Sequence, residues 1–122
     1  MVEDVALTFH ALGKLPGPFI KWFLQELSHR QLCDLLGPGM DRSATSAVCY
    51  GWFDGTELRF FDGQLPGSIA MSPRGTGGFG FDPIFVPNGS VHTHAEMDDT
   101  EVERFGLRAT TVYPQLREFL RA

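Results

Sequence analysis

Basic residues, cysteines and long apolar runs are scarce in this chain of 122 residues. Ten Lys and Arg stand against fifteen Asp and Glu, so the formal charge of -5 predicts no general nucleic-acid binder, because such proteins offset phosphate repulsion with a basic face. Two cysteines are too few for a disulfide framework, and no apolar run is long enough for a signal sequence or a membrane span. These absences predict a reducing, cytoplasmic location without nucleic-acid or membrane partners.

The segment 74–87, RGTGGFGFDPIFVP, is the part of the chain most typical of a binding site. Its glycines let a backbone approach a ligand closely or take a positive φ, which residues with a Cβ do poorly. Phe79, Phe81 and Asp82 add rings that stack on a planar group and a carboxylate that accepts hydrogen bonds. The combination favours a pocket for a base; the alternative is a set of turns around a buried aromatic strand.

The same segment fits the dinucleotide fingerprint G-x-G-x-x-G from Gly75 to Gly80. That fingerprint needs a helix that opens at its last glycine, so that phosphate meets the helix N-terminus. Pro83 and Pro87 deny such a helix and favour a short extended run. The pattern therefore excludes a Rossmann site, and neither a Walker loop nor a Ser-His-Asp spacing is present elsewhere.

The first residues, VEDVALTFHAL, alternate in the manner of a strand that carries two carboxylates near its beginning. Adjacent residues of a strand point to opposite faces, so only one of Glu3 and Asp4 is expected to enter a cleft. We interpret Asp4 as the catalytic candidate, since a carboxylate there can ligate Mg²⁺ or orient a water. The alternative is a solvated strand end. A chain that opens directly in a strand also suggests a start in mid-structure.

A helix is predicted over residues 19–27, because five of its apolar residues form one stripe. Lys21 would lie in its first turn and oppose the positive end of the helix dipole, a cost that a bound anion turns into a gain. Lys21 is therefore a candidate phosphate contact, or else a solvated surface lysine. A second helix is predicted from about Ser28 to Leu36, before the stop signal at residues 37–39.

Residues 43–69 alternate as strands, with the Asp54-Gly55 and Asp62-Gly63 pairs as candidate hairpin turns. The tail from Thr100 to Ala122 is helical in character, and Gly106 and Pro114 are expected to split it.

Three further residues with metal-binding groups alternate near the end of the chain: His92, His94 and Glu96. On a strand they would share one side, where a metal could bind, but the same pattern describes an ordinary polar strand face.

Several segments together resemble, in order and spacing, the inosine triphosphate pyrophosphatase family, and their wording is similar to its eukaryotic branch. They are VED at 2–4, ALGKLPGPFIKWFLQEL at 11–27, DRSA at 41–44, PRGTGGFGFDPIFVPNG at 73–89 and THAEM at 93–97. The resemblance implies an α/β fold, with an elongated mixed sheet, flanking helices and a central cleft. Residues 1–122 would form a single domain, the C-terminal two-thirds of the family's domain.

The activity implied is Mg²⁺-dependent cleavage of non-standard purine nucleoside triphosphates, such as ITP, dITP and XTP, to the monophosphate and pyrophosphate, commonly by a homodimer. By position, Asp4 matches the family's proton acceptor and metal partner, and Lys21 matches its phosphate-contacting lysine. The base wall matches Phe79, Gly80, Phe81 and Asp82. Arg108 matches the arginine of the family's Ser-His-Arg motif.

The chain departs from the family's pattern at several positions. The N-terminal strand, T-G-N-x-x-K loop and helix have no counterpart in this sequence. Val102 falls where the family has a base-contacting lysine, and Leu107 falls on the histidine of the motif. We therefore expect weak or absent turnover by this chain alone, and the alternative function is a catalytically inactive nucleotide-binding or scaffold homologue.

Overall fold

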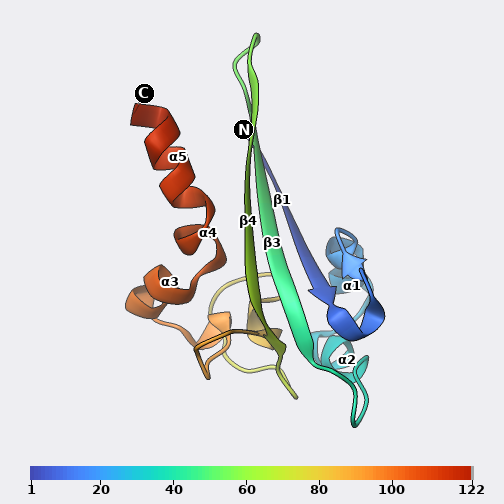
Figure 1. The fold of residues 1–122 in the computed structure, drawn as a ribbon. Helices are drawn as coiled ribbons and strands as arrows, with labels where there is room; N and C mark the ends of the chain where they lie inside the picture. Colours follow the sequence, from blue (N-terminus) through green and yellow to red (C-terminus); the bar gives the residue numbers. More distant parts are fainter. Residues whose placement is uncertain (122) are drawn as a thin grey trace.

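A sheet of five strands forms the centre of the computed structural model, which describes residues 1–121 (Figure 1). The strand order is β2-β1-β3-β4-β5. The strands are β1 (Val2–Phe9), β2 (Pro16–Gly17), β3 (Ser43–Phe53), β4 (Leu58–Ile69) and β5 (Phe85–Pro87). The expected α/β fold with flanking helices is confirmed. Each of the four neighbouring pairs is antiparallel, so within residues 1–121 the sheet is antiparallel rather than mixed.

The long β3–β4 hairpin turns at Asp54-Gly55, as predicted. The Asp54 carboxylate accepts the backbone N–H groups of Thr56 and Glu57 at 2.8 and 2.7 Å, and Gly55 takes a φ of +100°. The second predicted turn, at Asp62-Gly63, is wrong, because both residues lie inside β4. Gly63 serves packing instead: a Cβ there would overlap the side chain of Thr111.

One face of the sheet is covered. Along β1 the residues Glu3, Val5, Leu7 and Phe9 share this face, and the register sets them against Tyr50, Val48, Ser46 and Ala44 of β3. A first apolar cluster joins Leu7 and Phe9 to Ile20, Leu32 and Phe85. A second cluster packs Val48 and Phe61 against Leu107 and Val112. Helices and the 70–90 segment therefore lie on a single face of a twisted sheet.

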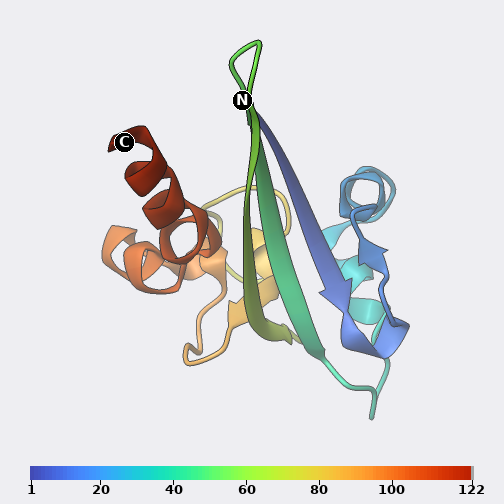
Figure 2. The same cartoon turned by 45° about the horizontal axis from the view of Figure 1, so that its top comes forward.

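Two helical groups flank the sheet (Figures 1 and 2). The first group is α1 (Ile20–Glu26) and α2 (His29–Asp34), and the second is α3 (Asp99–Phe105), α4 (Leu107–Thr110) and α5 (Val112–Arg121). Both early helices are confirmed, although Phe19 of the predicted stripe is 54% exposed. Gly106 splits the tail as expected. Pro114 does not, because it lies in the first turn of α5, where its missing N–H costs no helix bond.

The other face of the sheet is open. The side chains that alternate with the covered set include Asp4, Asp62 and Gln64, all exposed. Near the hairpin end this face also exposes Phe53 and Phe60, and Figure 1 shows the hairpin extending beyond the helices. The accessible surface of 7407 Å² exceeds the roughly 6,600 Å² expected for a compact protein of this mass, in agreement with a face that no described residue covers. No helix within residues 1–121 is both long and apolar enough to cross a membrane.

Candidate functional site

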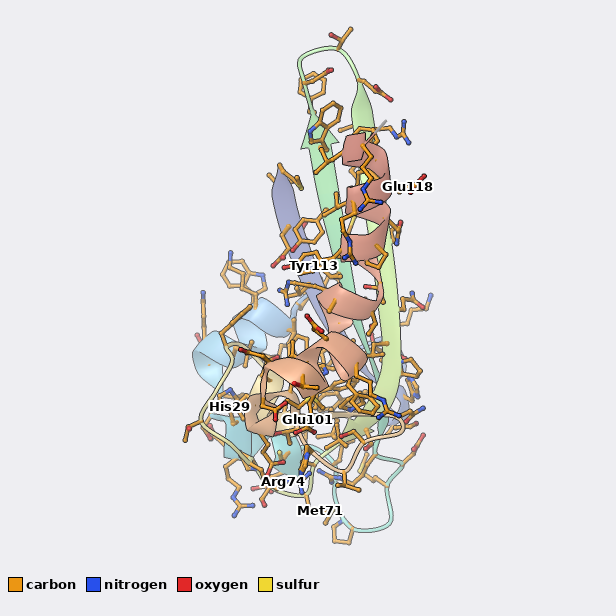
Figure 3. All side chains as sticks on the ribbon, turned by 90° about the vertical axis from the view of Figure 1, so that its left-hand side faces the viewer. His29, Met71, Arg74, Glu101, Tyr113 and Glu118 are labelled. Atoms are coloured by element: carbon orange, nitrogen blue, oxygen red, sulfur yellow. The ribbon has the colours of Figure 1, made fainter. Side chains whose placement is uncertain are left out.

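A cleft of about 560 Å³ opens on the covered face, between the first residues of β1, the glycine loop and the C-terminal helices. Its polar side chains include those of Glu3, Tyr50, Asp82, His94 and Arg108. Tyr113 of α5 also lines it, on the side that faces the viewer in Figure 3. Segments far apart in the sequence therefore meet at one concave surface that mixes apolar and charged groups, as ligand sites do.

A charge pair lies in the cleft wall. Arg108 donates from Nε to Oε2 of Glu3 and from Nη2 to Oε1, both at 2.8 Å, and Tyr50 donates its hydroxyl to the same carboxylate. The guanidinium also lies over the ring of Phe79, with its carbon 5.1 Å from the ring centroid. Bidentate pairing and stacking together fix the plane of the Arg108 side chain.

The pair shifts the ionisation of its members in opposite directions. The hydrogen bond from Arg108 lowers the pKa of Glu3 from 4.5 to about 2, against the opposing effect of burial. Burial and the Glu3 carboxylate raise the pKa of Tyr50 to about 12. The hydrogen bond to Glu3 raises the pKa of Arg108 further. Glu3 is therefore a carboxylate and Tyr50 a neutral hydrogen-bond donor across the physiological range, and neither is suited to general base catalysis at neutral pH.

The glycine loop is held by its own contacts. The Asp82 carboxylate accepts the backbone N–H of Phe79 at 3.0 Å, and a Cβ at Gly78 would overlap that carboxylate. Gly77 donates its N–H to the carbonyl of Ala95 at 3.1 Å. The glycines thus permit close packing inside the loop, and one oxygen of Asp82 already serves to close it.

The base-wall residues differ in exposure. Phe79 is 69% exposed and offers a ring to the cleft, whereas Phe81 is 6% exposed and packs edge-on against Phe85 in the first cluster. The carbonyl of Gly80 accepts a hydrogen bond from Nε2 of His29 in α2, at 2.7 Å. Phe79 is therefore the stacking surface that the cleft presents, and Phe81 mainly anchors the loop in the core.

Asp4 and Lys21 lie outside this set of lining residues. Asp4 is exposed on the open face, opposite Cys49 in the register, while Glu3 enters the cleft. Lys21 is exposed on α1, with its Nζ 5.5 Å from the ring centroid of Trp22. The structure thus gathers Phe79, Asp82 and Arg108 at one surface and leaves the two candidates for phosphate chemistry on other surfaces.

The His92, His94 and Glu96 trio does not form a strand face. Residues 94–96 form a 3₁₀ turn, where Glu96 accepts the N–H of Thr93. His92 pairs with Glu101, and His94 lies beside the Phe105 carbonyl and Asp82. No group of three or more metal-binding side chains gathers anywhere in residues 1–121. The prediction of a strand with these three side chains on one side is therefore wrong, and the residues stabilise the loop.

Sequence reasoning missed Glu3 and Tyr50. For Glu3 the sequence does contain a signal, because strand alternation requires one of the two adjacent carboxylates to face the helices. Alternation alone does not say which one. That choice follows from the apolar residues Leu7 and Phe9, which share the face of Glu3 and lie in the core. Tyr50 carried no signal until the register placed it opposite Glu3.

A second depression, of about 840 Å³, lies between α3 and α5. It is larger but more open, and its wall includes Val102, Tyr113, Leu116 and Leu120. The charge pair and the glycine loop do not line it. We therefore assign the candidate site to the smaller cleft, where convergent polar groups and the shifted pKa values are found.

Comparisons with known proteins show the family of the chain. The profile of the Ham1 family matches residues 1–118. Inosine triphosphate pyrophosphatase 1 of Trypanosoma cruzi is 42% identical over 112 residues, 89% of this chain and 57% of that protein. The inosine triphosphate pyrophosphatase of Fusarium vanettenii is 40% identical over 111 residues, 89% of this chain and 59% of that protein. The chain thus spans less than two-thirds of the length of these relatives.

Solved structures show the same similarity. A Ham1 protein from Coxiella burnetii superposes with a TM-score of 0.82 at 27% identity, over 98% of this chain and 66% of that chain. The Ham1 protein of Staphylococcus aureus superposes with a TM-score of 0.77 at 25% identity, over 98% of this chain and 65% of that chain.

Proposed function

Because the chain belongs to the Ham1 family, we propose that it binds a non-standard purine nucleoside triphosphate and takes part in its cleavage to the monophosphate and pyrophosphate. The relatives named inosine triphosphate pyrophosphatase, at 40–42% identity, support this class of substrate. The observation that carries the proposal is the cleft in which the exposed Phe79 ring and the Arg108 guanidinium meet.

The chemistry of a six-oxo purine matches that cleft. The exposed ring offers a stacking surface for any base, which gives affinity without selection. Arg108 supplies donors, and O6 and N7 of a six-oxo purine are both acceptors, whereas adenine presents an amino group in place of O6. Buried or half-buried donors left unpaired by the wrong base are an effective source of discrimination.

We assign the phosphate chemistry to Asp4 as proton acceptor and to Lys21 as phosphate contact. Both side chains are exposed, and neither forms an ion pair with another residue in 1–121. Over residues 2–6, β1 has no neighbour on the side away from β3 in the described part of the chain. Glu3 in the cleft and Asp4 on the open face are therefore separated only by the backbone of one edge strand.

Asp4 would also be the protein ligand of Mg²⁺. Mg²⁺ bound by nucleotide enzymes commonly takes one or two carboxylates together with substrate phosphates and waters, rather than a protein cage. A single exposed carboxylate fits this mode. The ion would neutralise triphosphate charge when bound.

The test is pyrophosphate release from ITP with Mg²⁺, alongside calorimetric titration with ITP and ATP. We expect ITP to bind in preference to ATP, with turnover below the roughly 1–1000 per second that is typical of enzymes. Asp4→Asn should abolish the release and leave binding of the base intact. Failure to bind any purine nucleotide would contradict the proposal.

A second candidate is a nucleotide-binding homologue without catalysis. The observation that favours it is the separation of Asp4 and Lys21 from the residues that line the cleft. ITP binding with no release of pyrophosphate above the buffer control would select this candidate.

We further propose that the chain assembles as a homodimer in a reducing, cytoplasmic compartment. The exposed apolar side chains near the hairpin, among them Phe53 and Phe60, support an assembly that covers them. Cys33 and Cys49 are both free, which is typical of a reducing environment. Light scattering on the purified chain tests the dimer: a monomer at high concentration would contradict it.

A further inference from the structure

The Glu3 carboxylate lines the cleft, and the family motifs assign it no role. Its side chain is one-third exposed, and both of its oxygens are taken by Arg108 and Tyr50. It reaches Arg108 across 105 residues of sequence, from β1 to α4. A carboxylate with both oxygens engaged in this way acts through its partner and not on a substrate.

We propose that Glu3 is the positioning residue for purine selection, because it holds one edge of the Arg108 guanidinium and so directs the other edge into the cleft. This inference rests on the proposed function, since it presumes that Arg108 meets the base.

The hydrogen bonds divide the guanidinium into two edges. Nε and one N–H of Nη2 point to Glu3, each at 2.8 Å. Tyr50 lies close enough to Arg108 to influence its ionisation. Neither Nη1 nor the second N–H of Nη2 forms a hydrogen bond of good geometry within residues 1–121, so these groups are the donors available to a ligand. Arg108 itself lines the cleft. The arrangement therefore presents two parallel donors from a rigid fork.

Phe79 fixes the remaining freedom. The guanidinium carbon lies 5.1 Å from the centroid of the Phe79 ring, so the charged plane is held on one side by the ring and along one edge by Glu3. Tyr50, opposite Glu3 in the β1–β3 register, donates its hydroxyl to the carboxylate and so limits the rotamers of Glu3. The donor pair is thus oriented before a ligand arrives, which reduces the ordering cost of binding.

Two fixed donors select a ligand with two adjacent acceptors. The O6 and N7 edge of a six-oxo purine meets this requirement, and the adenine edge offers one acceptor and one donor. If the guanidinium were free to rotate, it could turn a single N–H toward N7 of either base, and the preference would weaken. Selection therefore depends on Glu3 as well as on Arg108.

The experiment compares calorimetric dissociation constants of IMP and AMP for wild type, Glu3→Gln and a control, Glu57→Gln. Glutamine keeps the shape of Glu3 but replaces one acceptor oxygen by an NH₂ group, so the bidentate pair is lost. We expect the preference of wild type for IMP to fall by about tenfold in Glu3→Gln, the equivalent of about 1.4 kcal/mol, with little change for AMP. Glu57→Gln, in the exposed hairpin, should match wild type.

The conservative variant and a spectroscopic readout separate positioning from simple loss of fold. Glu3→Asp retains the charge and should recover part of the preference. In ¹⁵N NMR spectra the Nε–H of Arg108 should be a sharp, slowly exchanging signal in wild type and broaden in Glu3→Gln without nucleotide. If Glu3→Gln does not fold, Tyr50→Phe, which removes one hydroxyl, should lower the preference by roughly threefold, a fraction of the tenfold change expected above.

The outcomes distinguish the two claims. If Glu3→Gln keeps the wild-type preference for IMP over AMP, the positioning role is overturned and the proposed function is left intact. The same conclusion holds for Tyr50→Phe if Glu3→Gln does not fold. Absence of purine nucleotide binding by folded wild type overturns both.

Discussion

The two faces of the central sheet are built by the same strands but differ in what covers them. On the covered face, Leu7 and Phe9 are fully buried under α1, α2 and the glycine loop. On the open face, Asp4, Gln64 and Phe60 are exposed. Adjacent residues of one strand therefore differ: Glu3 forms an ion pair with Arg108 in the cleft, whereas no residue within 1–121 forms an ion pair with Asp4. This difference separates base recognition from the proposed phosphate chemistry.

Truncation of one phenylalanine on each face should show the largest difference in the free energy of unfolding between the two faces. Phe9→Ala removes a ring that is 0% exposed and should lower the free energy of unfolding by about 3–5 kcal/mol. Phe60→Ala removes a ring that is 63% exposed in the single chain, so at protein concentrations where the chain is a monomer it should change the free energy of unfolding by no more than about 0.5 kcal/mol. Urea unfolding followed by circular dichroism measures both values. Equal losses would mean that the open face is covered in solution.

A methyl group added at Gly63 should have the next largest effect. Its Cβ would overlap the Thr111 side chain between α4 and α5, so Gly63→Ala should destabilise the protein by about 1–3 kcal/mol through overpacking. The neighbouring change Gln64→Ala, on the open face, should stay within about 0.5 kcal/mol. Thermal unfolding of the two variants provides the comparison. A harmless Gly63→Ala would contradict the close contact of the C-terminal helices with β4.

The acid dependence of stability should show the smallest difference. The pKa of Glu3 is lowered in the folded state from 4.5 to about 2 by Arg108, so its contribution is present above pH 4.5 and is lost as the pH falls toward 2. The groups that face it are Arg108 and Tyr50. Glu3→Gln should therefore lose stability less steeply than wild type over this interval, as measured by unfolding at a series of pH values. Parallel curves would show that the pair does not persist in solution.

Much of the fold followed from local patterns in the sequence. The β1 alternation, the Asp54-Gly55 turn and the start of α2 at Ser28 each depend on residues close in sequence, and each is confirmed. The α2 helix even begins at a capping box formed by Ser28 and Gln31. Such features could be predicted because local hydrogen bonds and side-chain periodicity specify them.

The errors arose where distant segments decide the structure. The Asp-Gly pair predicts a turn at Gly63, whereas the packing of Gly63 against Thr111 depends on a segment about fifty residues later. The local sequence gives Phe81 and Phe79 the same expected role, but Phe81 is buried in the core and Phe79 is exposed. The choice between Glu3 and Asp4 required the register of β1 with β3 and the position of Arg108. These are long-range contacts, which a single sequence does not encode in any local pattern.

The central claim, that a purine base is recognised from the covered face by Phe79 and Arg108, is tested most directly by a crystal structure of the chain with IMP. The prediction is a base stacked near the Phe79 ring, with its O6 within about 2.7–3.2 Å of an Arg108 nitrogen while Arg108 remains paired with Glu3. A base bound on the open face, or in the cleft without contact to Arg108, would contradict the claim.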